Sequence, residues 1–156
     1  ATAFSQSPDV TFTSGNLNSL PERAFKVATA IEVIEHIPDE NIAEFVSDIR
    51  DRVSDDGTLI VSVPTTNVPV TREHHRHYDL ELLSSHLSPH FEINDHLYIH
   101  QNSILFKLIK YMSSNRLFTT NSKFGLRMLT RLYRRYVAIA KASTGTHLVA
   151  VFKAKN

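Results

Sequence analysis

The chain has 156 residues, of which 42% are hydrophobic, so it is large enough to bury the core of one domain. It contains no cysteine, which excludes disulfides, thiolate nucleophiles and cysteine-ligated zinc. The first residues lack the basic-then-apolar order of a signal peptide, and no apolar run approaches the ~20 residues that cross a membrane. We therefore expect a single domain over residues 1–156 in a cytoplasmic protein.

Charge is distributed very unevenly along the chain. The first 95 residues hold all 16 acidic residues and six basic ones, a net charge of −10, whereas the last 61 hold 11 basic residues and no acidic one. Such a split indicates either that the basic part meets an anionic partner or that the two parts attract each other within one fold.

Strands are predicted where apolar and β-branched residues cluster or alternate between turn residues. One such run, 25–34, is mostly apolar and is typical of a strand buried on both faces. The predicted strands are 10–17, 25–34, 58–64, 91–100 and 146–154.

Helices are predicted between these strands from apolar residues at helical spacing. The first starts near Pro38, which suits the first turn of a helix, and Asp55-Asp56-Gly57 ends it. Its apolar positions are Ile42, Phe45, Val46, Ile49 and Val53. A second helix is predicted to follow Asp79, which can cap its first turn. Two further amphipathic helices are predicted at about 102–112 and 122–141.

The alternation of strands and helices predicts a parallel α/β sheet. Ligands bind such sheets at the carboxyl ends of the strands. Glu32, Glu35 and His36 lie at the end of the 25–34 strand, and residues 65–67 follow the next strand. The sequence therefore predicts a functional site at this edge of the sheet.

Four stretches occur in the order and at the spacing found in one enzyme family: FTSGNLNSLP, FKVATAIEVIEHIPDE, VSDDGTLIVSVPTTN and HHRHYDLELL. Over residues 10–93 the chain thereby resembles the second half of a class I S-adenosylmethionine-dependent methyltransferase. The resemblance implies a Rossmann-like sheet, S-adenosylmethionine as cofactor, and transfer of its methyl group to an O or N acceptor. The acceptor would be a small molecule, a sugar or a lipid-linked substrate.

The cofactor loop of that family is missing from the sequence. Family members hold the cofactor with a Gly-rich loop after their first strand and an acidic residue after their second, but this chain has four glycines and no Gly-x-Gly. We therefore expect an incomplete sheet without the family's first two strands and their helices. The 25–34 strand would then have an exposed edge, or another chain would complete it in a homo-oligomer. Such a chain is either part of a longer enzyme and inactive alone, or a degenerate, non-catalytic interaction module.

The resemblance assigns cofactor contacts to three residues. Asn16 takes the place of an Asp near the adenine amino group and can still accept a hydrogen bond through its carbonyl oxygen. Leu17 would pack on the adenine, and Glu32 would line the cofactor pocket.

Glu32, Glu35 and His36 also match a metal-binding pattern. Positions i, i+3 and i+4 share a face on one helical turn, and two carboxylates with an imidazole suit a divalent ion such as Mg²⁺ or Mn²⁺. Small-RNA 2′-O-methyltransferases and ubiquinone-pathway O-methyltransferases, which this segment resembles, show Glu-x-x-Glu-His followed by a later histidine. By position the fourth ligand would be His75, although residues 74–77 contain two further histidines.

Two alternatives to a metal site remain open. His36 or His75 could act as a general base, since imidazole titrates near neutral pH. The same residues could also simply line the pocket. The remaining histidines, at positions 86, 90, 96, 100 and 147, are scattered, and we expect surface or core roles for them.

Residues 101–141 form a basic, amphipathic helical insertion before the last strand. Its second predicted helix has a broad apolar face beside a cationic stripe within 123–135, namely Lys123, Arg127, Arg131, Arg134 and Arg135. This segment could pack as a lid over the site, lie on an anionic membrane surface or bind nucleic acid. Its many apolar residues favour a membrane over a nucleic acid.

Overall fold

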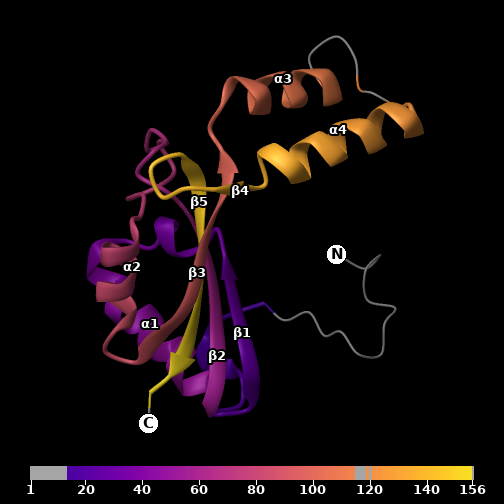
Figure 1. Cartoon of the computed structure of the whole chain (residues 1–156). Coiled ribbons are helices and arrows are strands. Elements are labelled where there is room, and N and C mark those ends of the chain that lie inside the picture. The colour runs from indigo at the N-terminus through magenta and orange to yellow at the C-terminus, as the bar shows by residue number, and fades with distance from the viewer. Residues whose placement is uncertain (1–13, 115–118, 120, 156) are drawn as a thin grey trace.

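The computed structural model describes residues 14–114, 119 and 121–155, which contain a five-stranded sheet (Figure 1). Its strands are β1 (Phe25–Ile31), β2 (Val53–Pro64), β3 (Phe91–Gln101), β4 (Ile139–Ala140) and β5 (Gly145–Ala154), in the order β1-β2-β5-β3-β4. β1 and β2 are parallel, whereas β5 is antiparallel to both of its neighbours, β2 and β3. The α/β class is confirmed, and the predicted parallel pairing is found between β1 and β2.

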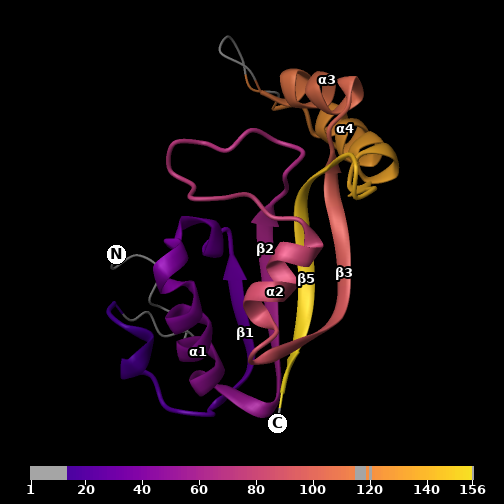
Figure 2. The ribbon, with the colours of Figure 1, turned by 90° about the vertical axis from the view of Figure 1, so that its left-hand side faces the viewer.

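Two helices, α1 (Ile42–Arg52) and α2 (Leu80–Leu87), lie on the same face of the sheet (Figure 2). Asp79 caps α2 as predicted, since its carboxylate accepts a hydrogen bond from the amide of Leu82 at 2.8 Å. Each large apolar side chain buried beneath these helices contributes about 1.5–3 kcal/mol to folding. The core between helices and sheet includes Val46, Ile49, Leu59, Val61, Leu83, Leu87, Leu148 and Phe152.

The opposite face of the sheet is open within the described ranges. Ile31, Ser62, Val149 and Leu97 are cross-strand neighbours in one row on that face. Ile31 and Leu97 are 53% and 41% exposed. β1 also pairs with β2 alone and so forms an edge of the described sheet. The edge position of β1 among the described strands agrees with the prediction, while the absence of the family's first two strands stays a prediction.

The chain between β1 and α1 differs from the predicted form. β1 ends at Ile31 rather than at residue 34. Two 3₁₀ turns, Ile34–His36 and Asp39–Asn41, follow it, and α1 starts at Ile42 rather than near Pro38. The residues of the predicted site therefore lie in an irregular loop instead of on a strand end and a helix.

β2 is longer than predicted and starts at Val53 instead of residue 58. The Asp-Asp-Gly segment that was expected to end the first helix lies inside this strand, where the pairing with β1 shifts register between Phe25 and Val27. A Cβ atom at Gly57 would clash with Cγ1 of Val53 and would lie only 2.8 Å from the backbone carbonyl oxygen of Ser54. So close a backbone approach requires glycine.

A second pair of helices, α3 (Ile104–Ser113) and α4 (Lys123–Tyr136), stands beyond the carboxyl ends of the parallel strands (Figure 1). The two run in opposite directions and have a small core of their own, built around Ile109, Leu129 and Val137. The second predicted helix ends at Tyr136 rather than at residue 141, because the chain then pairs with β3 as β4. No helix in the described ranges is long and apolar enough to cross a membrane.

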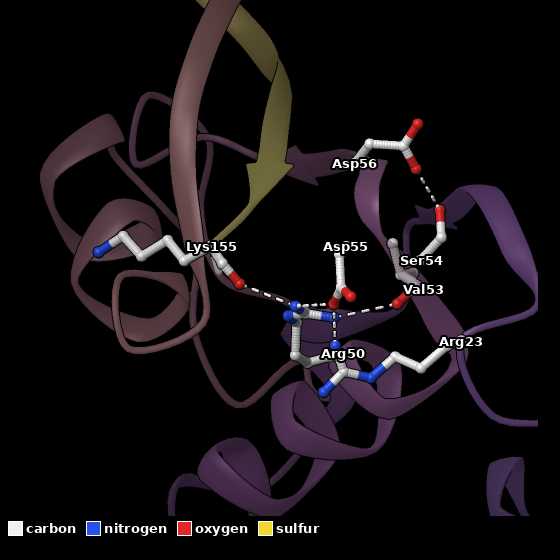
Figure 3. A network of polar contacts seen from close by, with 7 residues as sticks. All are labelled: Arg23, Arg50, Val53, Ser54, Asp55, Asp56 and Lys155. Carbon is white, nitrogen blue, oxygen red and sulfur yellow. Dashed lines mark hydrogen bonds and ion pairs between the residues drawn. The ribbon is translucent and has the colours of Figure 1, made fainter.

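The predicted strand 10–17 lies mostly outside the described residues, and Leu17–Ser19 forms a 3₁₀ turn. At the amino end of the parallel strands, buried Arg50 joins three elements (Figure 3). Its guanidinium donates to the carbonyl oxygens of Val53 (3.0 Å) and Lys155 (2.7 Å) and to the carboxylate of Asp55 (3.0 Å). This network fixes α1 against the start of β2 and the end of β5, at the opposite end from the predicted site.

Candidate active site

The predicted site residues lie on two loops, one after β1 and one after β2. Arg76 fastens the second loop to the first, since its guanidinium donates to the carbonyl oxygens of Ile34 (3.3 Å) and Ile37 (2.7 Å). The amide of His75 also donates to the carbonyl oxygen of Glu35 (2.8 Å). These bonds place the histidine run of the second loop against the first.

Glu35 is fully buried, yet its carboxylate has no hydrogen-bond partner in the described part of the chain. Its exposed fraction is 0%, and neither Oε1 nor Oε2 meets a donor there. Burial raises the pKa of this carboxyl, and the negative charge of Glu32 raises it further. An unpartnered buried carboxylate costs folding free energy. A bound cation or a proton on this carboxylate would remove that cost.

The imidazole of His36 is close to this carboxylate. Its Nε2 lies 3.9 Å from Oε1 of Glu35, and its Nδ1 lies 2.9 Å from the carbonyl oxygen of Glu73. A carbonyl oxygen only accepts, so Nδ1 carries the proton and donates it. When the ring is neutral, Nε2 therefore keeps a lone pair near Glu35.

Two hydrogen bonds in series fix the tautomer of His74. Nδ1 of the buried His77 lies 2.9 Å from the carbonyl oxygen of Val68 and must donate to it. Nε2 of His77 then accepts from Nδ1 of His74, at 2.8 Å. When the His74 ring is neutral, its Nε2 is left with a lone pair. The ring meets that of His36 edge-on, with centroids 4.6 Å apart.

One carboxylate oxygen and two imidazole nitrogens thus converge. Glu35, His36 and His74 each offer one ligand atom, and these atoms all lie within 4.8 Å of one another. Mixed oxygen and nitrogen donors suit divalent ions of intermediate hardness. Nδ1 of each histidine is bonded to a carbonyl oxygen or to a second ring, which leaves Nε2 for a metal, an arrangement that is usual for metal-bound histidine. The residues therefore fit a divalent cation.

Of the four residues predicted as metal ligands, the structure brings Glu35 and His36 together and adds His74. Glu32 precedes the 3₁₀ turn with a φ of 53°, and its carboxylate contacts Ser62 and His147 instead of joining this group. Positions i, i+3 and i+4 share a face only within a regular helix. The side chain of His75 is exposed, and this residue contributes its backbone amide to the site.

Glu32 belongs to a second polar cluster with β2 and β5. Its Oε1 accepts from the hydroxyl of Ser62, and its Oε2 lies 3.4 Å from Nε2 of His147. Burial by itself would raise the pKa of Glu32, but the hydrogen bonds with His147 and Ser62 outweigh burial and lower it. The same bond with Glu32 raises the pKa of His147. Both shifts favour the charged forms, so the two residues form an ion pair.

The sequence predicts only a structural role for His147, and the structure places it at the site. β5 is antiparallel to β2, so its first residues lie beside the last residues of β2, and His147 is paired with Pro64. The ring of His100 is 5.3 Å from that of His147, and its Nδ1 is 2.7 Å from the hydroxyl of Tyr133 on α4. Recognising an antiparallel last strand would have placed both histidines here.

The residues predicted to contact adenine lie at the start of the described chain. Asn16 caps the Leu17–Ser19 turn, and its Oδ1 accepts from the amide of Asn18 at 3.2 Å. Leu17 lines an apolar hollow of about 360 Å³ beside β1, together with Phe25, Val33 and Phe45. None of the ionisable residues of the two polar clusters lines this hollow.

The profile of the family described as "Methyltransferase domain" matches residues 2–131. The chain belongs to the class I S-adenosylmethionine-dependent methyltransferases. This confirms the family predicted from the sequence, while the likeness to the small-RNA and ubiquinone-pathway enzymes stays a prediction. No curated protein matches this methyltransferase domain in sequence at a significant level.

Solved structures share the fold at low sequence identity. A SAM-dependent methyltransferase from Archaeoglobus fulgidus is 15% identical, with a TM-score of 0.56 over 88% of this chain and 62% of that one. The 1,6-didemethyltoxoflavin-N1-methyltransferase of Burkholderia thailandensis, solved with S-adenosylhomocysteine, is 15% identical, with a TM-score of 0.58 over 93% and 51%. The [4+2]-cyclase SpnF is 16% identical, with a TM-score of 0.53 over 92% and 56%. The chain therefore spans 51–62% of the length of these proteins.

Proposed function

We propose that the complete protein transfers the methyl group of S-adenosylmethionine to an oxygen or nitrogen atom of a small-molecule or lipid-linked acceptor. Family membership supports the cofactor. The proposed place of the acceptor rests on the convergence of Glu35, His36 and His74 at the carboxyl edge of the sheet. α/β folds bind their ligands at this edge. Methyl transfer needs an acceptor that is oriented and freed of its proton, and these groups are suited to the second task.

Glu35, His36 and His74 would hold a divalent cation, Mg²⁺ or Mn²⁺, at the acceptor side. The unpartnered carboxylate and the two Nε2 lone pairs support this assignment. A bound cation would supply Lewis acidity and lower the pKa of an acceptor hydroxyl. The chain's own contribution is to orient the donors, through the carbonyl oxygen of Glu73 behind His36 and the ring of His77 behind His74.

The same side chains support a second route to the same deprotonation. Nε2 of His74 or His36 can take the acceptor proton directly, and the buried carboxylate of Glu35 would then stabilise the imidazolium that forms. His75, predicted as a base from the sequence, has an exposed side chain, and His74 takes its place in this proposal.

For the cofactor, we infer that Asn16 and Leu17 contact the adenine when the domain is complete. The apolar hollow that Leu17 lines supports this assignment. Glu32 would line the cofactor pocket from the loop after β1.

Activity assays of the complete protein with and without a chelator test the metal. We expect activity to depend on Mg²⁺ or Mn²⁺, and Glu35→Gln or His74→Ala to lower kcat/KM by roughly 100-fold or more. His96→Ala, an exposed histidine on β3, is the matched control and should leave the rate unchanged. Full activity in excess chelator, combined with a low rate in His74→Ala, would indicate that His74 takes the acceptor proton without a metal. Full activity in both variants would reject the site.

Calorimetric titration of the complete protein with S-adenosylmethionine tests the function as a whole. Binding is expected, with S-adenosylhomocysteine competing. Failure to bind either molecule would favour the alternative of a non-catalytic interaction module. That alternative is based on the absence of Gly-x-Gly from this chain.

A further inference from the structure

The α3–α4 pair has two sides of different character. A groove between the helices is lined by residues that include Phe106, Lys110, Leu126 and Thr130. Residues two apart on an α-helix point about 200° away from each other. Leu108 is two residues from both Phe106 and Lys110, and Met128 is two residues from both Leu126 and Thr130. Leu108 and Met128 therefore point away from the groove.

The side away from the groove, here called the outer face, is apolar and exposed. It bears Ile104 and Leu108 of α3 and Phe124 and Met128 of α4. Phe124 points away from the groove because it is two residues before the groove residue Leu126. The exposed fractions of the four are 86%, 50%, 78% and 45%, respectively. Four large apolar side chains thus lie in solvent on this helix pair, which stands beyond the sheet (Figure 1).

Cations border the outer face along α4. Arg127, Arg131 and Arg135 are exposed and recur every four residues, so they form one row on the helix. No acidic residue follows Asp95 in the sequence. In the ranges that the structure describes, none of the three arginines belongs to an ion pair. The outer face therefore combines apolar side chains with uncompensated positive charge.

We propose that the outer face docks on an anionic lipid bilayer, with its apolar side chains in the interfacial region and its arginines against lipid phosphates. A nucleic acid or free phosphate would account for the arginines but would leave the four apolar side chains in water. A bilayer interface accommodates both. α3 and α4 have 10 and 14 residues, so the pair would lie in the plane of the interface. The inference does not depend on the methyl transfer.

Flotation of the full chain with phosphatidylcholine vesicles, with and without phosphatidylglycerol, tests this proposal without any cofactor. We expect flotation with the anionic vesicles only. Binding should fall as salt rises from ~0.1 M to ~1 M, which shortens the screening length from ~10 Å to ~3 Å. The triple variant Arg127→Glu, Arg131→Glu, Arg135→Glu should lower the partition coefficient by more than about 100-fold, since each cation at such a surface contributes roughly fivefold.

Two matched controls separate the outer face from general charge and hydrophobicity. The triple variant Lys26→Glu, Arg72→Glu, Lys141→Glu has the same net charge, changes three exposed cations elsewhere and should float like the wild type. The double variant Ile104→Ser, Phe124→Ser should weaken binding even at low salt. Val70→Ser, which changes a loop residue that is 54% exposed, should not.

Equal binding to neutral and anionic vesicles, or equal loss in both charge variants, would overturn the proposal. An RNA gel shift under conditions where vesicles are not bound would instead assign the arginines to nucleic acid. Dimerisation that Phe124→Ser abolishes, without vesicle binding, would assign the face to a second copy of the chain. Circular dichroism checks the folding of each variant, and if the arginine variant unfolds, the serine variants decide the outcome.

Discussion

Oε2 of Glu32 lies 3.4 Å from Nε2 of His147, so an ion pair joins the loop after β1 to the first residues of β5. Glu32 also accepts from the hydroxyl of Ser62, which extends the link to β2. The pKa of Glu32 is lowered and that of His147 is raised, so folding favours the charged form of each. The stability of this edge of the sheet should therefore vary with pH in a defined window.

Glu32→Gln should reduce the free energy of unfolding most in mildly acidic solution. The contribution of Glu32 is present above its ordinary pKa of 4.5 and is lost as pH falls through the lowered value. The contribution of His147 is present below its ordinary 6.5 and is lost as pH rises through the raised value. Because both side chains are about one-third exposed, we expect a difference of no more than ~1 kcal/mol. Urea unfolding across pH checks this, with exposed Glu44→Gln as control, and a pH-independent difference would contradict it.

Glu35→Met should stabilise the fold while removing the function of the site. The buried carboxylate has no hydrogen-bond partner in the described residues, and burial raises its pKa, so its charged form opposes folding. Replacing it with an apolar side chain of similar size should raise the free energy of unfolding at neutral pH by ~1–3 kcal/mol. The gain should shrink as pH falls and the wild-type carboxyl protonates. Glu44→Met on the exposed side of α1 is the control, and a destabilised Glu35→Met would show that this carboxylate has a partner in the folded protein.

His77→Phe should weaken the site without touching a ligand atom. The ring of His77 fixes the tautomer of His74 through a 2.8 Å hydrogen bond. Loss of such a supporting bond typically lowers metal affinity by about 10–100-fold. Calorimetry with Mn²⁺ measures the change, and His96→Phe on β3 serves as control. Unchanged affinity in His77→Phe would mean that His74 is not a ligand.

Much of the architecture could be predicted from the sequence, because it follows from apolar periodicity. The apolar positions at helical spacing from Ile42 to Ile49 do face the core. The two strands predicted at 25–34 and 58–64 form the parallel pair β1 and β2. The cap at Asp79 was also predictable, since a side chain and the adjacent backbone suffice to form it. These features depend on local pattern and on burial.

The details of the site could not be predicted, because they depend on irregular backbone and on contacts between distant segments. The φ of 53° at Glu32 separates it from Glu35, and nothing in the local pattern demands that conformation. The choice of His74 over its neighbours follows from the hydrogen bonds of Arg76 across two loops. His147 reaches the site only through the antiparallel direction of β5.

Arg50→Met should destabilise the fold far more than Arg23→Met, although both arginines contact Asp55 (Figure 3). Arg50 is buried, and its loss leaves the carbonyl oxygens of Val53 and Lys155 without this donor, a cost of about 2–3 kcal/mol. Arg23 is half exposed, so its ion pair should contribute less than about 1 kcal/mol. Equilibrium unfolding in urea measures both, and similar losses would show that the ion pairs, rather than the carbonyl contacts, stabilise this end of the sheet.

The unpaired edge of β1 should let copies of this chain associate. A charged side chain introduced on β1 should prevent that association. Val27 and Ile31 are 55% and 53% exposed, and β1 pairs with β2 alone among the described strands. An exposed apolar edge strand offers unpaired amide and carbonyl groups to another chain, and lysine on such a strand blocks that pairing. Val27→Lys should therefore shift the chain toward monomer in sedimentation velocity while changing the free energy of unfolding by only about 0.5 kcal/mol. Val70→Lys, on a loop residue of similar exposure, adds the same charge away from the edge and should leave association unchanged. A wild-type chain that stays monomeric at every concentration would contradict this prediction.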